Sequence, residues 1–485
     1  MPNSLTNRAI DSMIWVTIDK GVGYTLVFLS NLVLARLLLP EDFGCIAMIN
    51  VFIAISDILI HGGFGAALIQ KKETSQVDYS SVFFINLLVS FILYVLLFLS
   101  APAVASFYKL PLLNNVLRVQ SLVLIINSFT IVQVSILQRN LRFKSLAMRN
   151  IISGIIGLIC GVVCALNGMG VWSLVISTLA SRFSGVFLLW RASEWRPSLE
   201  FSFHNVKGLF GFGGFMMASS IIGSIYDNLQ SILIGKFYTA SDLGYVNQAK
   251  KLESIPSGML SSVVSQVSFP VFSSIQDNCE SVKSGLKKNI KSIEYINMPM
   301  TLLLILIAEP LITLMYGERW CNSVPYFQIL CFSRLIGVIV PLNMTVVSSQ
   351  GHGKQYFLAQ LVKFSFSIIV VLISLRHGIY ALLMALATIP LFDFVVWSFL
   401  SNRILKYGTL QQLIDILPTL IVSMITAGFT YVLGVIFNCS QYIIMVIQII
   451  TYVCTYIALT KLFRFDAFYI YQRILKEKVL KTRGI

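Results

Sequence analysis

LARLLLPEDFGCIAMINVFIAISDILIHGGFGAALIQKK, residues Leu34–Lys72, is the stretch from which the fold can be inferred. It contains the end of one apolar helix, a tight acidic turn at Pro40–Gly44, a second apolar helix and a glycine-rich exit. A weaker copy follows 200 residues later, where Phe237–Gln248 (FYTASDLGYVNQ) aligns with Leu37–Met48 (LLLPEDFGCIAM). The two turns are therefore predicted to be corresponding corners of two lobes embedded in a membrane.

The composition places the whole chain in a membrane. Of its 485 residues, 56% are hydrophobic and only 12% are charged, whereas soluble domains carry roughly 25% charged residues. The apolar runs have the length of membrane-spanning helices, since barrel strands need only about 10 residues and alternate in polarity. The predicted fold class is all-α integral membrane. The net charge of +15 does not indicate nucleic-acid binding, because the basic residues lie in short loops between apolar runs.

Fourteen apolar runs are long enough to span a bilayer. They cover residues 13–38, 44–66, 80–103, 116–138, 146–166, 171–190, 209–235, 244–272, 293–316, 326–348, 356–375, 379–400, 417–437 and 442–463. With the N-terminus on the cytoplasmic side, 24 of the 36 Lys and Arg residues fall on that side and five on the other. The positive-inside rule therefore predicts cytoplasmic N- and C-termini.

Further sequence echoes extend the repeat beyond the first corner. Gly170–Leu174 (GVWSL) is echoed by Gly378–Leu382 (GIYAL), and Leu137–Ala147 is echoed by Ser349–Ala359 at an offset of 212. Six spans return the chain to the side on which it started, so the repeat is predicted to be parallel. The predicted domains are an N-terminal lobe at 1–203, a C-terminal lobe at 204–405, two added spans at 406–464 and a basic cytoplasmic tail at 465–485.

Catalytic and metal-binding signatures are missing from the sequence. Its four histidines form no HExxH motif, no GxxxxGK[ST] loop occurs, and the eight cysteines form no CxxC pair. We therefore predict a protein that is not an enzyme, with no catalytic residue, no metal and no cofactor.

Charged residues inside the apolar runs are the candidate functional residues, because a charge in hydrocarbon is costly and faces the protein interior or a wet cavity by default. The predicted substrate-binding residues are basic: Lys20, Arg36, Arg182, Lys250, Lys251 and Arg334. The predicted ion-coupling residues are acidic: Asp19, Asp57, Asp227 and Asp393. The alternative for each is a structural ion pair or a side chain that reaches the membrane surface, and it is favoured for Arg36, Arg118 and Lys363.

LARLLLPEDFG, the glycine-rich exit Gly62–Lys72 and Asp78-Tyr79-Ser80 together resemble bacterial polysaccharide-exporting flippases. These are the O-antigen, colanic-acid and teichuronic-acid type within the multidrug/oligosaccharidyl-lipid/polysaccharide exporter superfamily. The resemblance implies a V-shaped, two-lobed transporter of the bacterial inner membrane. The cationic cavity of that family would correspond to Lys20, Arg36, Arg182, Lys250 and Lys251. The arginine-rich first helix of peptidoglycan-precursor flippases is only partly matched, by Asp19-Lys20 and Arg36.

The implied function is to flip undecaprenyl-diphosphate-linked oligosaccharides from the cytoplasmic to the periplasmic leaflet by alternating access. The implied partners are this lipid, the bilayer, H⁺ or Na⁺ as a coupling ion, and polysaccharide polymerase machinery. Three alternatives stay open. A peptidoglycan-precursor flippase shares the fold, and a drug or cation exporter would favour an acidic cavity. A membrane glycan polymerase would need a large external loop, which the predicted topology lacks.

Overall fold

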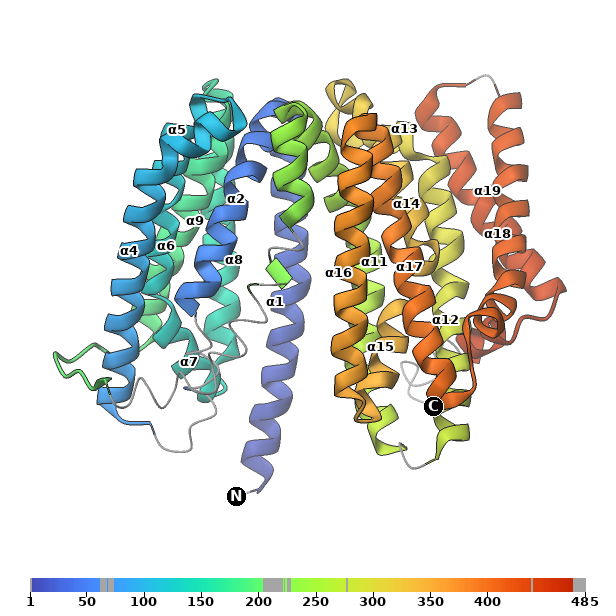
Figure 1. The fold of residues 1–485 in the computed structure, drawn as a ribbon, viewed down its shortest axis with the longest axis horizontal. Coiled ribbons are helices and arrows are strands. Elements are labelled where there is room, and N and C mark those ends of the chain that lie inside the picture. The colour runs from blue at the N-terminus through green and yellow to red at the C-terminus, as the bar shows by residue number, and fades with distance from the viewer. Residues whose placement is uncertain are drawn as a thin grey trace. The chain divides into compact units, whose positions relative to one another are not determined.

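The computed structural model describes residues 2–61, 68, 74–203, 221, 223–224, 228–275, 278–437 and 439–473, and these contain helices and no strand (Figure 1). The predicted all-α fold class is confirmed. Most of the glycine-rich exit Gly62–Lys72, most of the predicted seventh span and the tail beyond residue 473 lie outside the described residues.

The chain divides into two compact units, unit 1 (Met1–Asn247) and unit 2 (Gln248–Ile485), and the boundary falls within helix α11 (Ala240–Ser274). The other helices of unit 1 are α1 (Pro2–Leu37), α2 (Pro40–His61), α4 (Gln76–Tyr108), α5 (Leu112–Gln120), α6 (Leu122–Ser128), α7 (Ile131–Arg139), α8 (Phe143–Leu166) and α9 (Val171–Ala192). The predicted domain boundary at 203/204 stays a prediction.

Unit 2 continues from α11 with long helices and several shorter segments. They are α12 (Cys279–Leu306), α13 (Ala308–Tyr316), the 3-10 helix η1 (Glu318–Ser323), α14 (Val324–Gly337), α15 (Val340–Ser349), α16 (Gly353–Ser374), η2 (Leu375–His377), α17 (Ile379–Leu405), α18 (Thr409–Ile436) and α19 (Gln441–Leu462). Its hydrophobic core joins α12, α15, α17 and the start of α18, and it includes Phe272, Leu342 and Trp397.

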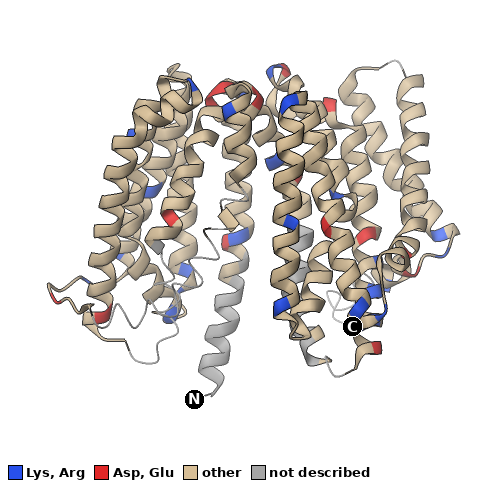
Figure 2. Ribbon diagram, viewed as in Figure 1, with Lys and Arg blue, Asp and Glu red and all other residues tan. Residues whose placement is uncertain are grey.

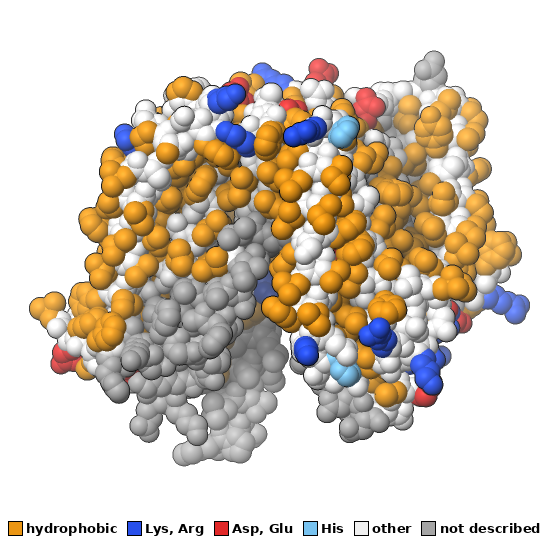
Figure 3. All heavy atoms as spheres, in the orientation of Figure 1, with side chains coloured by type: hydrophobic (Ala, Val, Ile, Leu, Met, Phe, Trp, Pro, Cys, Tyr) orange, Lys and Arg blue, Asp and Glu red, His pale blue; other side chains and the backbone are white. Residues whose placement is uncertain are grey.

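Eleven described segments are long and apolar enough to cross a membrane, and the bent pair α12–α13, with an angle of 73°, can add a twelfth. The fourth and tenth predicted spans are interrupted helices: residues 112–139 form α5, α6 and α7, and residues 318–349 form η1, α14 and α15. Many side chains on the outer faces are large and apolar, as expected where lipid replaces water (Figure 3).

The two acidic corners have the same local structure. The Asp42 carboxylate accepts a hydrogen bond from the Leu39 backbone N–H at 3.0 Å, and Asp242 accepts one from Thr239 at 3.2 Å. Each carboxylate thereby satisfies a backbone donor at the start of its helix, α2 or α11. The repeat inferred from the sequence thus has a structural counterpart at the same offset of 200 residues.

The two corners also pack against each other within unit 1, through their glycines. A Cβ atom built on Gly44 would lie 1.8 Å from the Ala240 carbonyl oxygen, and one built on Gly244 would lie 1.9 Å from the Pro40 carbonyl oxygen. Ordinary contact begins at about 3.4 Å, so both backbones approach more closely than any side chain permits. Glycine is required at both positions because of this reciprocal contact.

The other two echoes are turns with left-handed backbone. Gly170 and Gly378 have φ of 52° and 89° immediately before α9 and α17. In the third echo, Leu141 (φ 55°) corresponds to Gly351 (φ 77°), because α8 and α16 each begin two residues later. The structural offset there is 210 residues, so the sequence alignment at 212 was wrong by two residues. The positions of the left-handed turns therefore define the register of this repeat.

Candidate functional site

Unit 1 contains a polar cluster between membrane helices α1 and α8. The Asn150 side-chain amide donates to both carboxylate oxygens of Asp19 at 3.0 Å, and Arg149 Nη1 donates to Asn150 Oδ1 at 2.9 Å. Asp19, a predicted ion carrier, is therefore linked to an arginine through one amide. Helix α1 packs against α8, so Asn150 can reach Asp19 on α1. The adjacent Arg149 faces a different neighbour, helix α9.

The Arg149 guanidinium lies over α9, where the residue beneath it is Gly185. A Cβ atom at Gly185 would be 3.0 Å from Arg149 Nε and 3.2 Å from Nη2. Arg149 Nε is buried and has no hydrogen-bond partner among the described residues. Arg182 precedes Gly185 by about one helical turn, and its charge acts unfavourably on Arg149. We call Asp19, Arg149, Asn150 and Arg182 the unit-1 cluster.

The unit-1 cluster carries two cations and one carboxylate, so its formal charge is positive. An unbonded guanidinium N–H inside a membrane protein is costly, and a negatively charged ligand group can satisfy it. Guanidinium groups match phosphate oxygens geometrically, with parallel N–H donors. The cluster therefore has the chemistry of a site for a phosphate-bearing headgroup.

Three other predicted residues of unit 1 lie apart from this bonding network. Lys20 is exposed on α1, beside Asp19, and Arg36 is exposed near the C-terminal end of the same helix. Asp57 on α2 accepts a hydrogen bond from the Asn127 amide of α6 at 2.9 Å. This bond gives Asp57 a structural partner, and its ion-coupling role stays a prediction.

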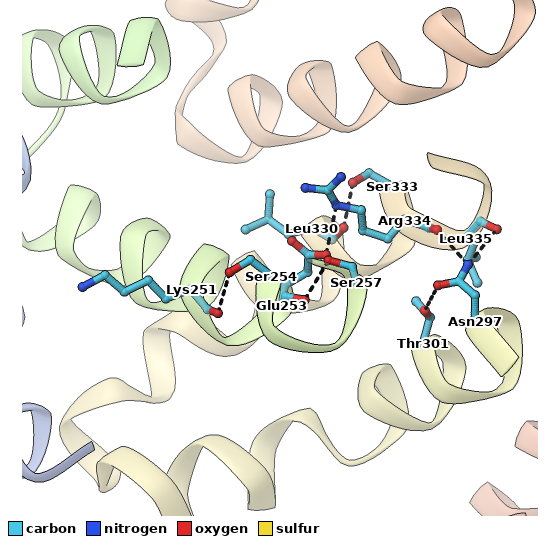
Figure 4. Close-up of polar contacts among 10 residues, drawn as sticks. All are labelled: Lys251, Glu253, Ser254, Ser257, Asn297, Thr301, Leu330, Ser333, Arg334 and Leu335. Carbon is cyan, nitrogen blue, oxygen red and sulfur yellow. Dashed lines mark hydrogen bonds and ion pairs between the residues drawn. The ribbon is translucent and has the colours of Figure 1, made fainter. Parts of the chain in front are cut away.

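In unit 2, the charged residues of α11 lie in two different environments. Lys250 and Lys251 are exposed, whereas Glu253 is buried and forms an ion pair with Arg334 of α14, with 2.9 Å between Arg334 Nε and Glu253 Oε1. Figure 4 shows Glu253 and Arg334 facing each other while Lys251 extends away from them. Arg334 therefore neutralises a buried carboxylate. The exposed fraction of its side chain is 38%, which leaves surface for other contacts.

Asp393 of α17 is paired with Lys363 of α16, with 2.7 Å between Lys363 Nζ and Asp393 Oδ2. An ion pair is one of the two structural alternatives that the sequence favours for Lys363, the other being a side chain that reaches the membrane surface. An ammonium group of the protein itself thus occupies the position that a coupling cation would take beside Asp393. Figure 2 shows further charged residues along the helices as well as at their ends.

Asp227 lies outside the described residues, so its predicted coupling role has no geometry to compare. Within the described part of the chain, no three His, Cys, Asp or Glu residues are grouped so that they could hold a metal ion.

Sequence reasoning missed four residues: Arg149, Asn150, Glu294 and Asn297. Arg149 is three residues inside the predicted span at 146–166, so the sequence assigns it to the cytoplasmic end of that span. Distance along the sequence does not show which way a helix residue faces. Glu294 follows a lysine-rich segment and resembles the end of a loop. A usable signal was its helical spacing from Lys291, Asn297 and Thr301, which places all four on one face of α12.

Curated relatives align over about two thirds or more of their length. The chain is 24% identical to the teichuronic acid biosynthesis protein TuaB of Bacillus subtilis, over 73% of this chain and 74% of TuaB. It is 27% identical to the succinoglycan biosynthesis transport protein ExoT of Rhizobium meliloti, over 70% and 68%. It is 25% identical to the lipopolysaccharide biosynthesis protein WzxC of Escherichia coli, over 69% of this chain and 68% of WzxC.

Solved structures share the fold. The lipid II flippase MurJ in an inward closed conformation superposes with a TM-score of 0.75 at 15% identity, over 94% of this chain and 98% of MurJ. An inward-facing multidrug transporter of the MATE family and MOP superfamily superposes with a TM-score of 0.59 at 17% identity, over 82% and 100%. A sequence model described as polysaccharide biosynthesis protein matches residues 33–325, more than half of the chain. The chain belongs to this family of polysaccharide biosynthesis membrane proteins.

Proposed function

We propose that the chain flips undecaprenyl-diphosphate-linked oligosaccharide repeat units from the cytoplasmic to the periplasmic leaflet by alternating access. The product would feed the synthesis of a surface polysaccharide such as O-antigen or exopolysaccharide. Family membership is the observation that carries the proposal, together with relatives whose names refer to polysaccharide biosynthesis and transport. In this proposal the protein moves the lipid and performs no chemistry on it.

The unit-1 cluster supports a diphosphate-bearing substrate. Its two arginines carry more charge than Asp19 neutralises, and Arg149 Nε has a donor to offer. A diphosphate supplies several oxygens to such donors, and each charge-assisted bond is stronger than a neutral one. We assign Arg149 and Arg182 to the headgroup, with Lys20, Arg36, Lys250, Lys251 and Arg334 as the further basic residues predicted from the sequence.

The membrane setting of the proposal follows from charge and family. The excess of lysine and arginine on one side of the predicted topology supports cytoplasmic N- and C-termini. TuaB, ExoT and WzxC come from bacteria, so the membrane would be the bacterial inner (plasma) membrane. A proton or sodium gradient would reset the transporter, and a polysaccharide polymerase would take the flipped repeat unit.

The test is a deletion strain in which undecaprenyl-linked repeat units are measured on each side of the inner membrane. Loss of the protein should leave the repeat units in the cytoplasmic leaflet and abolish the surface glycan. Complementation with the wild-type gene should restore both. Normal delivery of repeat units to the periplasm in the deletion strain would refute the proposal.

A peptidoglycan-precursor flippase is the second candidate, because MurJ shares the fold over 94% of this chain. The two candidates differ in their consequence for growth. Loss of a peptidoglycan-precursor flippase stops wall synthesis and growth, whereas loss of a surface-polysaccharide flippase removes the glycan from a viable cell. A viable, glycan-free deletion strain would exclude the second candidate.

A further inference from the structure

A line of polar residues runs along one face of membrane helix α12. Lys287, Lys291, Glu294, Asn297 and Thr301 are separated by four, three, three and four positions, the spacing of one helix face. The line begins with lysines that bond Asp415 and ends among residues that are almost fully buried. Burying polar residues inside a membrane helix costs free energy, so their presence indicates a functional role by default.

Glu294 is completely buried, and its surroundings contain more hydrogen-bond acceptors than donors. Its Oε2 accepts from Asn297 Nδ2 at 2.9 Å, while Oε1 has no partner among the described residues. The same Asn297 nitrogen donates to the Arg334 carbonyl oxygen at 3.1 Å and to that of Leu335 at 3.4 Å. Figure 4 shows Asn297 directed toward these two residues. A side-chain amide has two hydrogens for these three acceptors. One additional proton on Glu294 would supply the missing donor.

Among the described residues, the charged and titratable groups near Glu294 on the helices packed around α12 are bound to partners other than Glu294. These bonds are Arg334 with Glu253, Lys287 and Lys291 with Asp415, Lys363 with Asp393, Tyr456 with the Tyr295 carbonyl, Tyr295 with Thr460, and Tyr471 with the Ser292 carbonyl. Helix α15 carries no titratable residue. An ionised Glu294 would therefore be a buried charge without a counter-charge, a state that proteins avoid by protonation.

We propose that Glu294 is a proton-binding site of unit 2, reached along the polar face of α12 from its lysine-bearing end. The inference rests on the proposed transport function for its purpose, and a proton is the ligand class that this geometry fits. The Asn297 amide nitrogen already lies between Glu294 Oε2 and the carbonyl oxygens of Arg334 and Leu335, so a metal cation that bridged these oxygens would have to displace it.

Protonation would act on the interrupted tenth span. Asn297 bonds the carbonyl oxygens of Arg334 and Leu335, which precede the break between α14 and α15 at residues 338–339. Neutralising Glu294 changes how strongly it holds the Asn297 amide, and Asn297 transmits the change to the helix break. Interrupted helices with exposed carbonyls are places where transporters couple ion binding to movement.

The test compares wild type with Glu294→Gln, which resembles a permanently protonated carboxyl, and with Glu280→Gln, an exposed control on the same helix. Infrared difference spectra of the purified full-length protein report protonated carboxylic acid directly, without any substrate. We expect a pH-dependent carboxylic band that is lost in Glu294→Gln and retained in Glu280→Gln. Thermal unfolding in the same detergent checks that each variant folds. If Glu294→Gln does not fold, Glu294→Asp takes its place, and the carboxylic band is then expected to shift in frequency.

The transport arm uses proteoliposomes with an imposed proton or sodium gradient and an undecaprenyl-diphosphate oligosaccharide. Flipping by Glu294→Gln should fall to the rate seen without a gradient, and that by Glu280→Gln should match wild type. Three results would overturn the proton site: no band assignable to Glu294, a band that responds to sodium and not to pH, or unchanged proton-driven flipping in Glu294→Gln. If wild type itself flips nothing, the proposed function fails, and the infrared result still decides the proton site.

Discussion

Replacing Gly44 with alanine places a methyl group against the backbone carbonyl of Ala240. The built Cβ would lie 1.8 Å from that oxygen, so the two segments must separate by more than 1 Å to reach ordinary contact. Both partners are backbone at the starts of α2 and α11, and neither can rotate away as a side chain would. We expect Gly44→Ala to destabilise unit 1, and Gly244→Ala to do the same through the Pro40 carbonyl.

The size of the effect follows from two opposing contributions. Overpacking a tight contact costs about 1–3 kcal/mol or more. Alanine gains about 1 kcal/mol over glycine as a helix former, which offsets part of that cost. The variant Gly21→Ala measures the helix-propensity contribution alone, because a Cβ atom at Gly21 meets nothing within 4 Å. The difference between Gly44→Ala and Gly21→Ala isolates the steric cost.

Thermal unfolding of the purified protein in detergent, at one fixed scan rate, measures these differences. We expect Gly44→Ala to unfold roughly 2–12 °C below Gly21→Ala, taking a steric cost of about 1–3 kcal/mol and about 2–4 °C per kcal/mol for a unit of this size. Gly21→Ala should unfold at or above the wild-type temperature. The Gly44→Ala/Gly244→Ala double variant should lose less than the sum of the singles, since the first methyl already separates the corners. A Gly44→Ala protein as stable as Gly21→Ala would refute the steric argument.

Three further changes test the polar contacts. Asp393→Asn should lower stability by about 1–3 kcal/mol because it removes the carboxylate that pairs with the partly buried Lys363, whereas the double change to Asp393→Leu and Lys363→Met should recover most of this loss in the same unfolding assay. Arg149→Gln should reduce binding of a diphosphate-bearing lipid without lowering the unfolding temperature, and Arg182→Gln should do the same; unchanged lipid binding in both would contradict the headgroup assignment. Asn343→Leu, which removes an amide bonded to Gln412 and Ser401, should cost about 1–3 kcal/mol by leaving buried polar atoms unpaired.

The sequence alone was sufficient to predict the fold class and to recognise much of the internal repeat. Apolar runs about 20 residues long specify membrane helices directly, because hydrogen bonding in lipid permits little else. The corner at Asp42 and its copy at Asp242 could be recognised because a capping carboxylate three residues after its backbone donor is a local feature. Left-handed turns at Gly170 and Gly378 are also local, since glycine favours them regardless of distant packing.

The interruptions in the fourth and tenth spans could not be predicted by the same reasoning. Hydropathy stays high across Ser121 and across Val338-Ile339, because the apolar setting is unchanged where the helix breaks. Only the approach of another helix, such as the one carrying Asn297, provides the donors that make a break tolerable.

The candidate site was predicted by residue type but not by partner. Depth in the membrane follows from counting residues along a span, whereas pairing depends on which way each residue faces. Lys363 and Asp393 are 30 positions apart, and Arg334 and Glu253 are 81 apart, so neither pair leaves a local signal. Packing also decides which residues of one helix are buried and which are exposed, as for buried Glu253 and exposed Lys251 on α11.

The reciprocal glycine contact has a consequence for building chimeric proteins from this family. Each corner provides the carbonyl that the other corner's glycine accommodates, so segments 37–48 and 237–248 form one structural module despite their separation along the sequence. A chimera that takes its first 200 residues from one relative and the remainder from another would combine halves of two different modules. Exchanging both segments together preserves the fit, and we expect such paired exchanges to express better than single ones.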